Sequence, residues 1–169
     1  MLDSIVRFTA VVVLLLGLCF SDVIAETNKG HYTSSIIVRK KSNKDHTIAL
    51  LKGKNNITVS IAGRSLDAYM HQEGLGEVEI TTEAFEQKIT LTDGTSYYQL
   101  DFIFGPSSAF FTPDSLILTL KGKYVSNGVS VWLYDENGEA IDGRRKENKD
   151  MIQFEIDHFS NYYYDSYEY

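Results

Sequence analysis

Cysteine is almost absent from this chain. The only one among its 169 residues is Cys19, which lies in an apolar segment close to the N-terminus. Once that segment is removed, the remaining chain has no thiol to attack a substrate, bind a metal ion or form a disulfide. We therefore expect a domain that is held together by its hydrophobic core alone.

Positive charge is also scarce. The formal net charge is −7 at pH 7, and the only clusters of basic residues are Lys40-Lys41 and Arg144-Arg145-Lys146. Both clusters lie in polar stretches of the kind that form solvated loops. Because nucleic-acid binding needs a concentrated basic surface, the composition argues against a nucleic-acid partner.

Common catalytic and metal-binding patterns are missing as well. The histidines His31, His46, His71 and His158 do not have the spacing of metal ligands. The segment Asp135–Glu139 contains oxygen ligands and a glycine, but it lacks the full ligand series of a calcium loop and is more typical of a hairpin turn. No Gly-rich phosphate loop or nucleophile elbow is present. The sequence therefore predicts no metal, no cofactor and no conventional enzyme activity.

The N-terminus has the three parts of a secretory signal peptide. Arg7 is followed by an apolar run from Phe8 to Phe20, and Val23-Ile24-Ala25 provides a small-residue cleavage site before Glu26. The apolar run is too short to span a bilayer. We expect residues 1–25 to be a signal peptide and the mature protein to be secreted or periplasmic, without a membrane span.

Cys19 raises the alternative of a lipid anchor. The residue before a lipidated cysteine is normally small, and Leu18 is too bulky for that position. We therefore expect an unlipidated chain, in which Cys19 is an apolar residue of the removed segment.

The body of the sequence predicts an all-β fold. Runs rich in Ile, Val, Thr, Tyr and Phe recur at regular spacing, and Asx-Gly pairs typical of tight hairpin turns separate several of them. Leu66, Tyr69 and Met70 have helical spacing and follow Ser65, a candidate cap, so we expect a short helix or crossover near residues 65–73. We predict an antiparallel β-sandwich of about nine strands in a single domain, residues 26–164. The expected strands are residues 36–39, 47–51, 57–61, 77–82, 88–92, 97–104, 116–120, 129–134 and 152–157.

The last expected strand ends in an unusual way. Ile152, Phe154 and Ile156 lie on one face, and the same parity places His158 and Ser160 on the apolar side. Buried polar side chains need hydrogen-bond partners. The three residues from His158 to Ser160 are therefore required by the structure or by chemistry.

Several segments together resemble ZU5-like β-sandwich domains. They are Phe104-Gly105-Pro106-Ser107 with Phe111, Pro113 and residues 116–120, the hairpin 132–139, the final segment 157–162, and the upstream strand and turn 56–66. The resemblance covers residues 45–164, and Ala62-Gly63 and Ser108 depart from the family's pattern. ZU5-like domains are mostly interaction modules, and exported bacterial proteins carry similar domains with the same ending. The resemblance implies a binding or structural role, with Phe104, Gly105, Pro106, His158, Phe159 and Ser160 as a structural motif.

Aromatic residues suggest where binding would occur. One face of the expected strand 129–134 is aliphatic, and Trp132 lies on the other face, so that face meets a partner or another part of the chain. Five of the eight residues 162–169 are tyrosine, and 165–169 form an acidic, Tyr-rich tail. The tail either frays after completing the last strand or docks on a partner through its rings. The candidate partner-binding residues are Trp132, Tyr162, Tyr163, Tyr164, Tyr167 and Tyr169.

These observations favour an exported, non-enzymatic β-sandwich module that mediates protein–protein or cell-surface interaction. One alternative is a carbohydrate-binding module, in which Trp132 and the tail tyrosines stack on sugar rings. Another is a self-processing domain that cleaves itself between Phe159 and Ser160, as some ZU5-like domains do at the same three residues. Ser160 would attack the carbonyl of Phe159 with His158 as base. In the simpler interpretation, His158 and Ser160 only hydrogen-bond the strand end to its neighbour.

Overall fold

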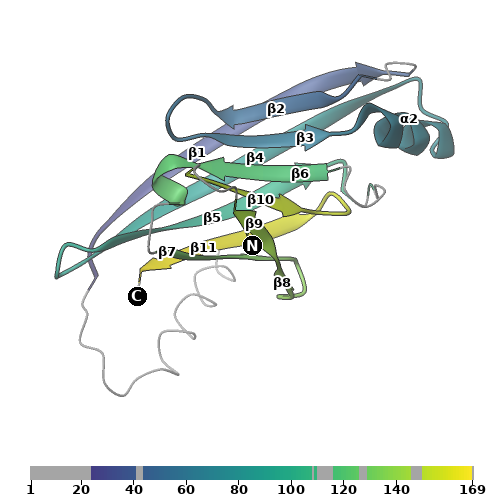
Figure 1. Ribbon diagram of the computed structural model, residues 1–169. Helices are drawn as coiled ribbons and strands as arrows, with labels where there is room; N and C mark the ends of the chain where they lie inside the picture. The colour runs from purple at the N-terminus through teal and green to yellow at the C-terminus, as the bar shows by residue number, and fades with distance from the viewer. Residues whose placement is uncertain are drawn as a thin grey trace.

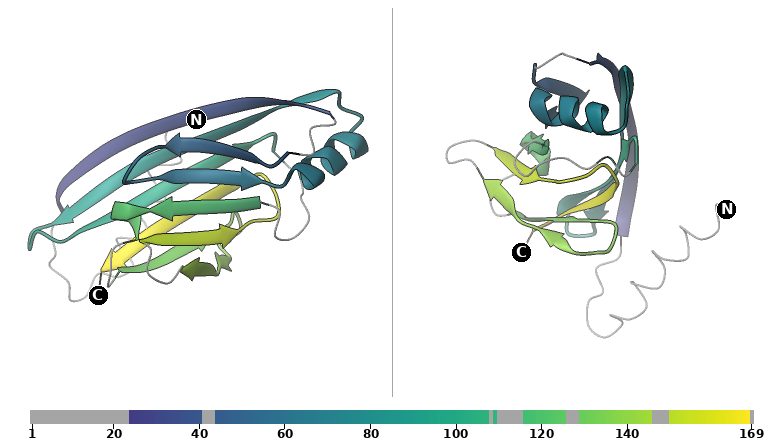
Figure 2. Two further views of the ribbon diagram at one scale, coloured as in Figure 1. Left: turned by 45° about the horizontal axis from the view of Figure 1, so that its top comes forward. Right: turned by 90° about the vertical axis from the view of Figure 1, so that its right-hand side faces the viewer.

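Two antiparallel sheets pack face to face in the computed structural model of the protein (Figures 1 and 2). It describes residues 24–40, 44–107, 109, 116–125, 129–145 and 150–168, and of residues 24–28, 129, 145, 167 and 168 the backbone alone. The predicted all-β sandwich is confirmed. Residues 1–23 of the predicted signal peptide, with Cys19, lie outside the described residues, as do Ser108, Phe111, Pro113 and Tyr169.

The first sheet has six strands. Their spatial order is β1 (Ile24–Arg39), β4 (Glu77–Leu91), β5 (Ser96–Gly105), β11 (Asn161–Glu168), β7 (Val129–Tyr134) and β8 (Ala140–Ile141). The Asp93-Gly94 turn joins β4 to β5, and Gly94 has a φ of 90°, which the absence of a side chain allows.

The second sheet has five strands. Their order is β2 (His46–Leu51), β3 (Ile57–Ile61), β6 (Leu116–Lys121), β10 (Met151–Glu155) and β9 (Gly143–Arg145). The helix α2 (Gly63–Gln72) follows β3, and a 3-10 turn, η1 (Gly122–Tyr124), follows β6. In the described part of the chain, no helix has the length and the apolar character needed to cross a membrane.

The helix begins earlier than the sequence suggests. Ala62 is the N-cap residue, so Ser65 lies inside the first turn and does not cap the helix. The backbone N–H of Gly63 instead donates to Oδ1 of Asp45, at 3.0 Å. Leu66 and Met70 are fully buried, so their helical spacing corresponds to an apolar stripe along α2. The helix covers one end of the sandwich (Figure 1).

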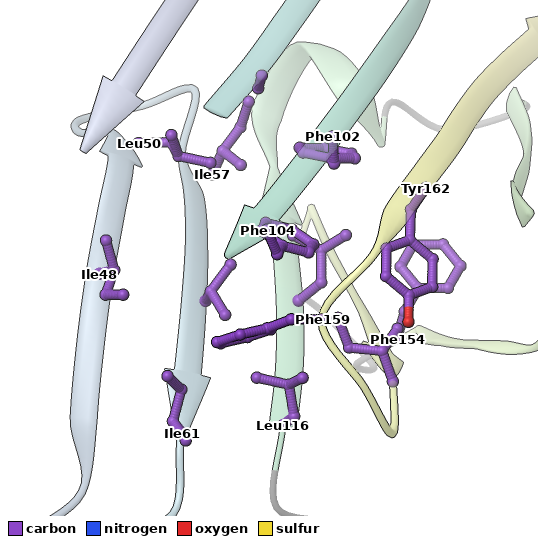
Figure 3. Close-up of a cluster of buried hydrophobic side chains, with 14 of the residues drawn as sticks. Ile48, Leu50, Ile57, Ile61, Phe102, Phe104, Leu116, Phe154, Phe159 and Tyr162 are labelled. Carbon is purple, nitrogen blue, oxygen red and sulfur yellow. The ribbon is translucent and has the colours of Figure 1, made fainter. Parts of the chain in front are cut away.

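The hydrophobic core lies between the two sheets, as Figure 3 shows. The ring of Phe104 lies near its centre, with centroid distances of 5.8 Å to Phe102, 6.0 Å to Phe159 and 5.8 Å to Tyr162. The second sheet contributes mainly aliphatic side chains to this core. They include Ile48, Ile57, Ile61, Leu116 and Leu118.

Two of the expected strands are one strand in the structure. The residues 77–82 and 88–91 both belong to β4, which continues through Glu83, Glu86 and Gln87. These polar residues interrupt the apolar pattern of the sequence. Glu86 nevertheless points into the sandwich, where its carboxylate pairs with Lys123. The strand β1 begins at Ile24, well before the expected residue 36, and pairs with β4 along almost its whole length.

The C-terminal segment does not continue the strand before it. The pairing of β10 with β6 ends at Glu155. Residues Asp157–Ser160 then cross from the second sheet to the first. Residues Asn161–Glu168 then form β11, which lies between β5 and β7 in the middle of the six-stranded sheet. The expectation that Tyr162–Tyr164 complete the preceding strand and that the rest frays is therefore wrong, because residues 161–165 pair with β5 and residues 163–168 pair with β7.

Candidate functional site

The outer face of the six-stranded sheet carries an unusual number of large apolar side chains. Side chains alternate between the two faces of a strand, so the residues between the inward-pointing core residues point away from the sandwich. In the described part of the chain, all four large hydrophobic residues that are substantially exposed lie on this face. They are Ile37, Phe85, Ile103 and Trp132.

Strand register gathers three of these four residues into one region. One row across the sheet runs from Phe85 through Asp101 and Tyr163 to Tyr134. In the next row Trp132 lies opposite Asp165, and Ile103 lies two residues beyond Asp101 on β5. We call this region, comprising Phe85, Asp101, Ile103, Trp132, Tyr134, Tyr163 and Asp165, the aromatic face.

Two pairs of rings contact each other on this face of the sheet. The centroids of Tyr134 and Tyr163 are 6.3 Å apart, and His31 stacks on Phe85 with centroids 4.4 Å apart and ring planes at 7°. Trp132 is 47% exposed and borders the tyrosine pair. The neighbouring strands β4, β5, β11 and β7 therefore present aromatic side chains to solvent on one face of the sheet.

Two carboxylates lie among these rings. Partial desolvation by their surroundings raises the pKa of Asp101 and that of Asp165 above the ordinary value, and for Asp165 hydrogen bonds from Gln99 and the backbone of Ser166 offset part of the effect. Desolvation and the nearby charges of Asp165 and Asp101 also raise the pKa of Tyr163. Both carboxylates thus lie where a negative charge is disfavoured.

These carboxylates have no basic partner among the described side chains. None of the ion pairs between those side chains includes Asp101 or Asp165. Oδ1 of Asp165 is covered, and no described group forms a hydrogen bond with it. Most buried polar atoms in folded proteins do have a partner, so this arrangement calls for an explanation.

The structure separates the candidate tyrosines of the tail. Tyr162 and Tyr164 point inward and are buried in the core, so the expectation that they contact a partner is wrong. Tyr163 points outward and belongs to the aromatic face. The backbone of Tyr167 pairs with Ser130, but its side chain, like the whole of Tyr169, lies outside the described residues.

The segment His158–Ser160 lies where the chain crosses between the sheets. Phe159 is fully buried, its N–H donates to the carbonyl of Ala109 at 2.9 Å, and the carbonyl of Ser160 accepts from the N–H of Phe104 at 3.1 Å. The Tyr162 hydroxyl donates to the carbonyl of His158 at 2.9 Å. These bonds fix the crossing to β5 and to the loop that follows it.

Gly105 and Pro106 lie where β5 ends and the loop that contacts the crossing begins. Gly105 ends β5 beside Thr81, and a Cβ at this position would lie 2.5 Å from Oγ1 of Thr81. Pro106 follows through a cis peptide bond. Phe104 and Phe159 meet in the core, so both ends of the predicted structural motif contribute to the same packing.

The side chains of this crossing form a small polar cluster with an unexpected member. The hydroxyl of Ser160 donates to the carboxylate of Glu136, which the hairpin turn after β7 supplies. Nδ1 of His158 lies 2.5 Å from Oδ1 of Asp157, and Nε2 lies 4.0 Å from Oε1 of Glu136. The single proton of the hydroxyl is therefore directed at Glu136 and not at His158, the base expected from the sequence.

The turn that carries Glu136 is well ordered by Asp135. Oδ1 of Asp135 accepts hydrogen bonds from the backbone N–H groups of Asn137, at 2.9 Å, and Glu139, at 2.8 Å, and these bonds lower the pKa of Asp135. Gly138 has a φ of 81°. The hairpin expected at Asn137-Gly138 is thus present. Among the described residues, no group of three or more His, Cys, Asp and Glu side chains could hold a metal ion.

Searches with this chain found no matching family model, no matching curated protein and no matching solved structure. The geometry alone therefore defines the fold and the two candidate sites. The protein is a two-sheet β-sandwich with an aromatic outer face and a polar cluster at the crossing between the sheets.

Proposed function

We propose that this protein is an exported, non-enzymatic β-sandwich module that binds a partner protein or a cell surface through the aromatic face. One observation carries the proposal: among the described residues, the large hydrophobic side chains that remain exposed gather on one side of the molecule, and most of them in one patch. The outward-facing residues of a sandwich are normally polar. Contiguous exposed apolar patches in soluble proteins mark interaction sites.

The composition of the patch supports this function. Tryptophan and tyrosine are the residues that dominate binding energy at protein interfaces, because a large ring is buried with few rotatable bonds to fix. Trp132 and Tyr163 belong to neighbouring strands at the centre of a sheet, which holds them in place. A ZU5-like relationship, which we also propose, fits the same role in molecular interaction.

Export is part of the proposal and rests on the N-terminal sequence. N-terminal sequencing of material recovered outside the cytoplasm is expected to start at or near Glu26. A membrane-bound chain that retains Met1, or a chain that starts with acylated Cys19, would contradict it.

Binding to intact cells of the source organism tests the main function. Purified protein should co-sediment with these cells, and Trp132→Ser should reduce the bound fraction. The matched control is Ile37→Ser, because Ile37 is 65% exposed on the same outer face and pairs with Glu79, six residues along β4 from Phe85. That separation is about 20 Å. Equal binding by both variants and the wild type would contradict a role for the aromatic face.

The same assay separates a protein partner from a carbohydrate. Protease treatment of the cells should abolish binding if the partner is a protein, whereas periodate oxidation should abolish it if Trp132 and Tyr163 stack on sugar rings. The second result would favour the carbohydrate-binding alternative.

The hydrogen bond between Ser160 and Glu136 favours self-processing as a second candidate function. Glu136 would take the hydroxyl proton while Oγ of Ser160 attacks the carbonyl carbon of Phe159. The peptide nitrogen would then leave with that proton, and water would hydrolyse the resulting ester to a carboxylate on Phe159. The released segment would stay in place, because β11 pairs with both β5 and β7.

Intact mass under denaturing conditions tests this second candidate. Two species that sum to the mature chain plus one water are expected, and Ser160→Ala or Glu136→Gln should restore a single species. A single mass after long incubation at neutral pH would show that the cluster is structural.

A further inference from the structure

We propose that the aromatic face binds a basic segment of a partner protein, whose Lys or Arg side chains pair with Asp101 and Asp165 over the aromatic rings. This inference rests on the proposed function and names the chemistry of the partner. It goes beyond an apolar patch, because it assigns a role to two carboxylates that make the patch less suited to a purely hydrophobic partner.

Charge is the first argument. Asp101 and Asp165 form no ion pair with a described side chain, and the hydrogen bonding of Asp165 is incomplete. Desolvation disfavours their negative charges, as their raised pKa values indicate. A bound cation would compensate both charges. The protein as a whole, with a net charge of −7, would also attract a basic partner.

The interior of the same protein provides the second argument. Nζ of Lys123 lies 2.7 Å from the carboxylate of Glu86, 4.6 Å from the ring centroid of Tyr98 and 5.0 Å from that of Tyr124. A carboxylate and tyrosine rings thus hold a part-buried cation at the edge of the core. The aromatic face combines the same two kinds of group, with Asp101 beside Tyr163 in the register.

The positions of the carboxylates fit an extended segment. Asp165 lies opposite Gln99, two residues from Asp101 on β5, so the two aspartates are diagonal neighbours. Such neighbours are about 7–8 Å apart. In an extended peptide, side chains at alternate positions are about 7 Å apart on one side. A partner with basic residues at alternate positions would therefore place one cation over each carboxylate.

A neutral glycan fits these observations less well. Sugar hydroxyls can hydrogen-bond carboxylates and sugar rings can stack on Trp132, but a neutral ligand leaves both negative charges uncompensated. We therefore choose the basic segment, and a glycan is one outcome of the test that would overturn this choice.

Fluorescence anisotropy with a labelled peptide of alternating lysine and serine tests the inference. The mature protein should bind this peptide at low ionic strength, and the double variant Asp101→Asn with Asp165→Asn should weaken binding by about tenfold or more. Trp132→Ala should weaken binding as well, because it removes a cation–π partner. The matched control is the double variant Glu77→Gln with Glu79→Gln, which removes the same number of charges from exposed positions near the far end of β4 and should change affinity by less than about twofold.

The outcomes separate this inference from the proposed function. Equal weakening by both double variants, or none by the aspartate pair, would overturn the basic-segment inference. If Trp132→Ser still abolishes cell binding in that case, the proposed interaction function stands without it. Periodate-sensitive cell binding that persists after protease treatment would also overturn the inference, in favour of a glycan.

Discussion

Two acidic regions lie on opposite faces of the strand pair β4 and β5. They differ in whether the negative charge of the carboxylate is compensated by partners. Phe85 and Glu86 on β4 pair with Asp101 and Leu100 on β5, so Glu86 points into the sandwich while Asp101 points out of it. The inner carboxylate has a full set of partners. Asp101 and its neighbour Asp165 form no ion pair with a described side chain, and Oδ1 of Asp165 has no hydrogen-bond partner among the described groups.

The inner region shows how a buried carboxylate is accommodated. Glu86, only 9% exposed, receives Nζ of Lys123 and the hydroxyls of Tyr124 and Tyr32. Burial and the hydrogen bond to Glu86 raise the pKa of Tyr124 strongly, so its hydroxyl keeps the proton that it donates. A buried charge is tolerated when it is paired and hydrogen-bonded in this way.

The difference between the two regions indicates different roles. A satisfied network such as that around Glu86 contributes to a single, well-packed structure. Incompletely satisfied charges on an exposed face weaken the folded state, and proteins commonly keep such features where they bind something.

Removing the inner carboxylate should have the largest effect. Glu86→Ala leaves the ammonium of Lys123 without its carboxylate and removes the acceptor for two tyrosines, which should lower the free energy of unfolding by about 3–5 kcal/mol. The matched control is Glu83→Ala, because Glu83 lies on the outer face of the same strand and pairs with the exposed His31. The control should lose less than about 1 kcal/mol. Urea denaturation at pH 7 measures both values, and a similar loss in the two variants would refute the contrast.

Removing the outer charges should instead stabilise the protein. A folded-state pKa above the unfolded value means that the folded protein holds its protons more tightly, so these groups reduce stability as the pH rises through their folded-state pKa values. Because Asp101 is exposed and solvent screens its charge, Asp101→Asn with Asp165→Asn should raise the free energy of unfolding by no more than about 1 kcal/mol at pH 7. This gain should shrink as the pH falls through the folded-state pKa values, and it should be absent below about 4, where the aspartates are protonated in the unfolded chain as well.

The pH profile distinguishes this effect from a general change in net charge. The double variant Glu77→Gln with Glu79→Gln should show no comparable gain at pH 7, because both residues are exposed. Urea denaturation across the pH range gives both profiles. A wild-type protein as stable as the aspartate variant at pH 7 would mean that the two carboxylates are not strained.

Alternation along single strands made much of the fold predictable from the sequence. It identified β2, β3, β5, β6, β7 and β10 nearly as the structure has them, and it placed Trp132 away from the core. It failed where a polar side chain points inward. Because Glu86 interrupts the apolar pattern, the sequence predicted two strands where β4 is one. The hydroxyl of Ser166 hydrogen-bonds the backbone of Tyr98 at 2.9 and 3.1 Å. As a polar residue, Ser166 concealed that alternate residues of the tail point inward.

The candidate sites were less predictable, because they depend on contacts between distant strands. Asp101 and Asp165 become neighbours only through the register of β5 and β11, and Glu136 reaches Ser160 from a different hairpin. No local pattern in the sequence carries this information. Within the tail itself, however, strict alternation already separates Tyr163 from Tyr162 and Tyr164, and that signal was available.

The smallest effect on stability should come from the centre of the aromatic face. Trp132→Ser removes a ring that is half exposed and, in our interpretation, contributes to binding more than to folding. We expect the free energy of unfolding to change by about 0.5 kcal/mol or less, with a melting temperature close to that of the wild type. Phe102→Ala, on the inner face of β5, should cost about 3–5 kcal/mol in comparison, because Phe102 is fully buried. Calorimetry of the two variants beside the wild type checks the contrast. A loss for Trp132→Ser close to that for Phe102→Ala would show that the outer ring is part of the core packing, and the aromatic face would then lose its main candidate for a binding residue.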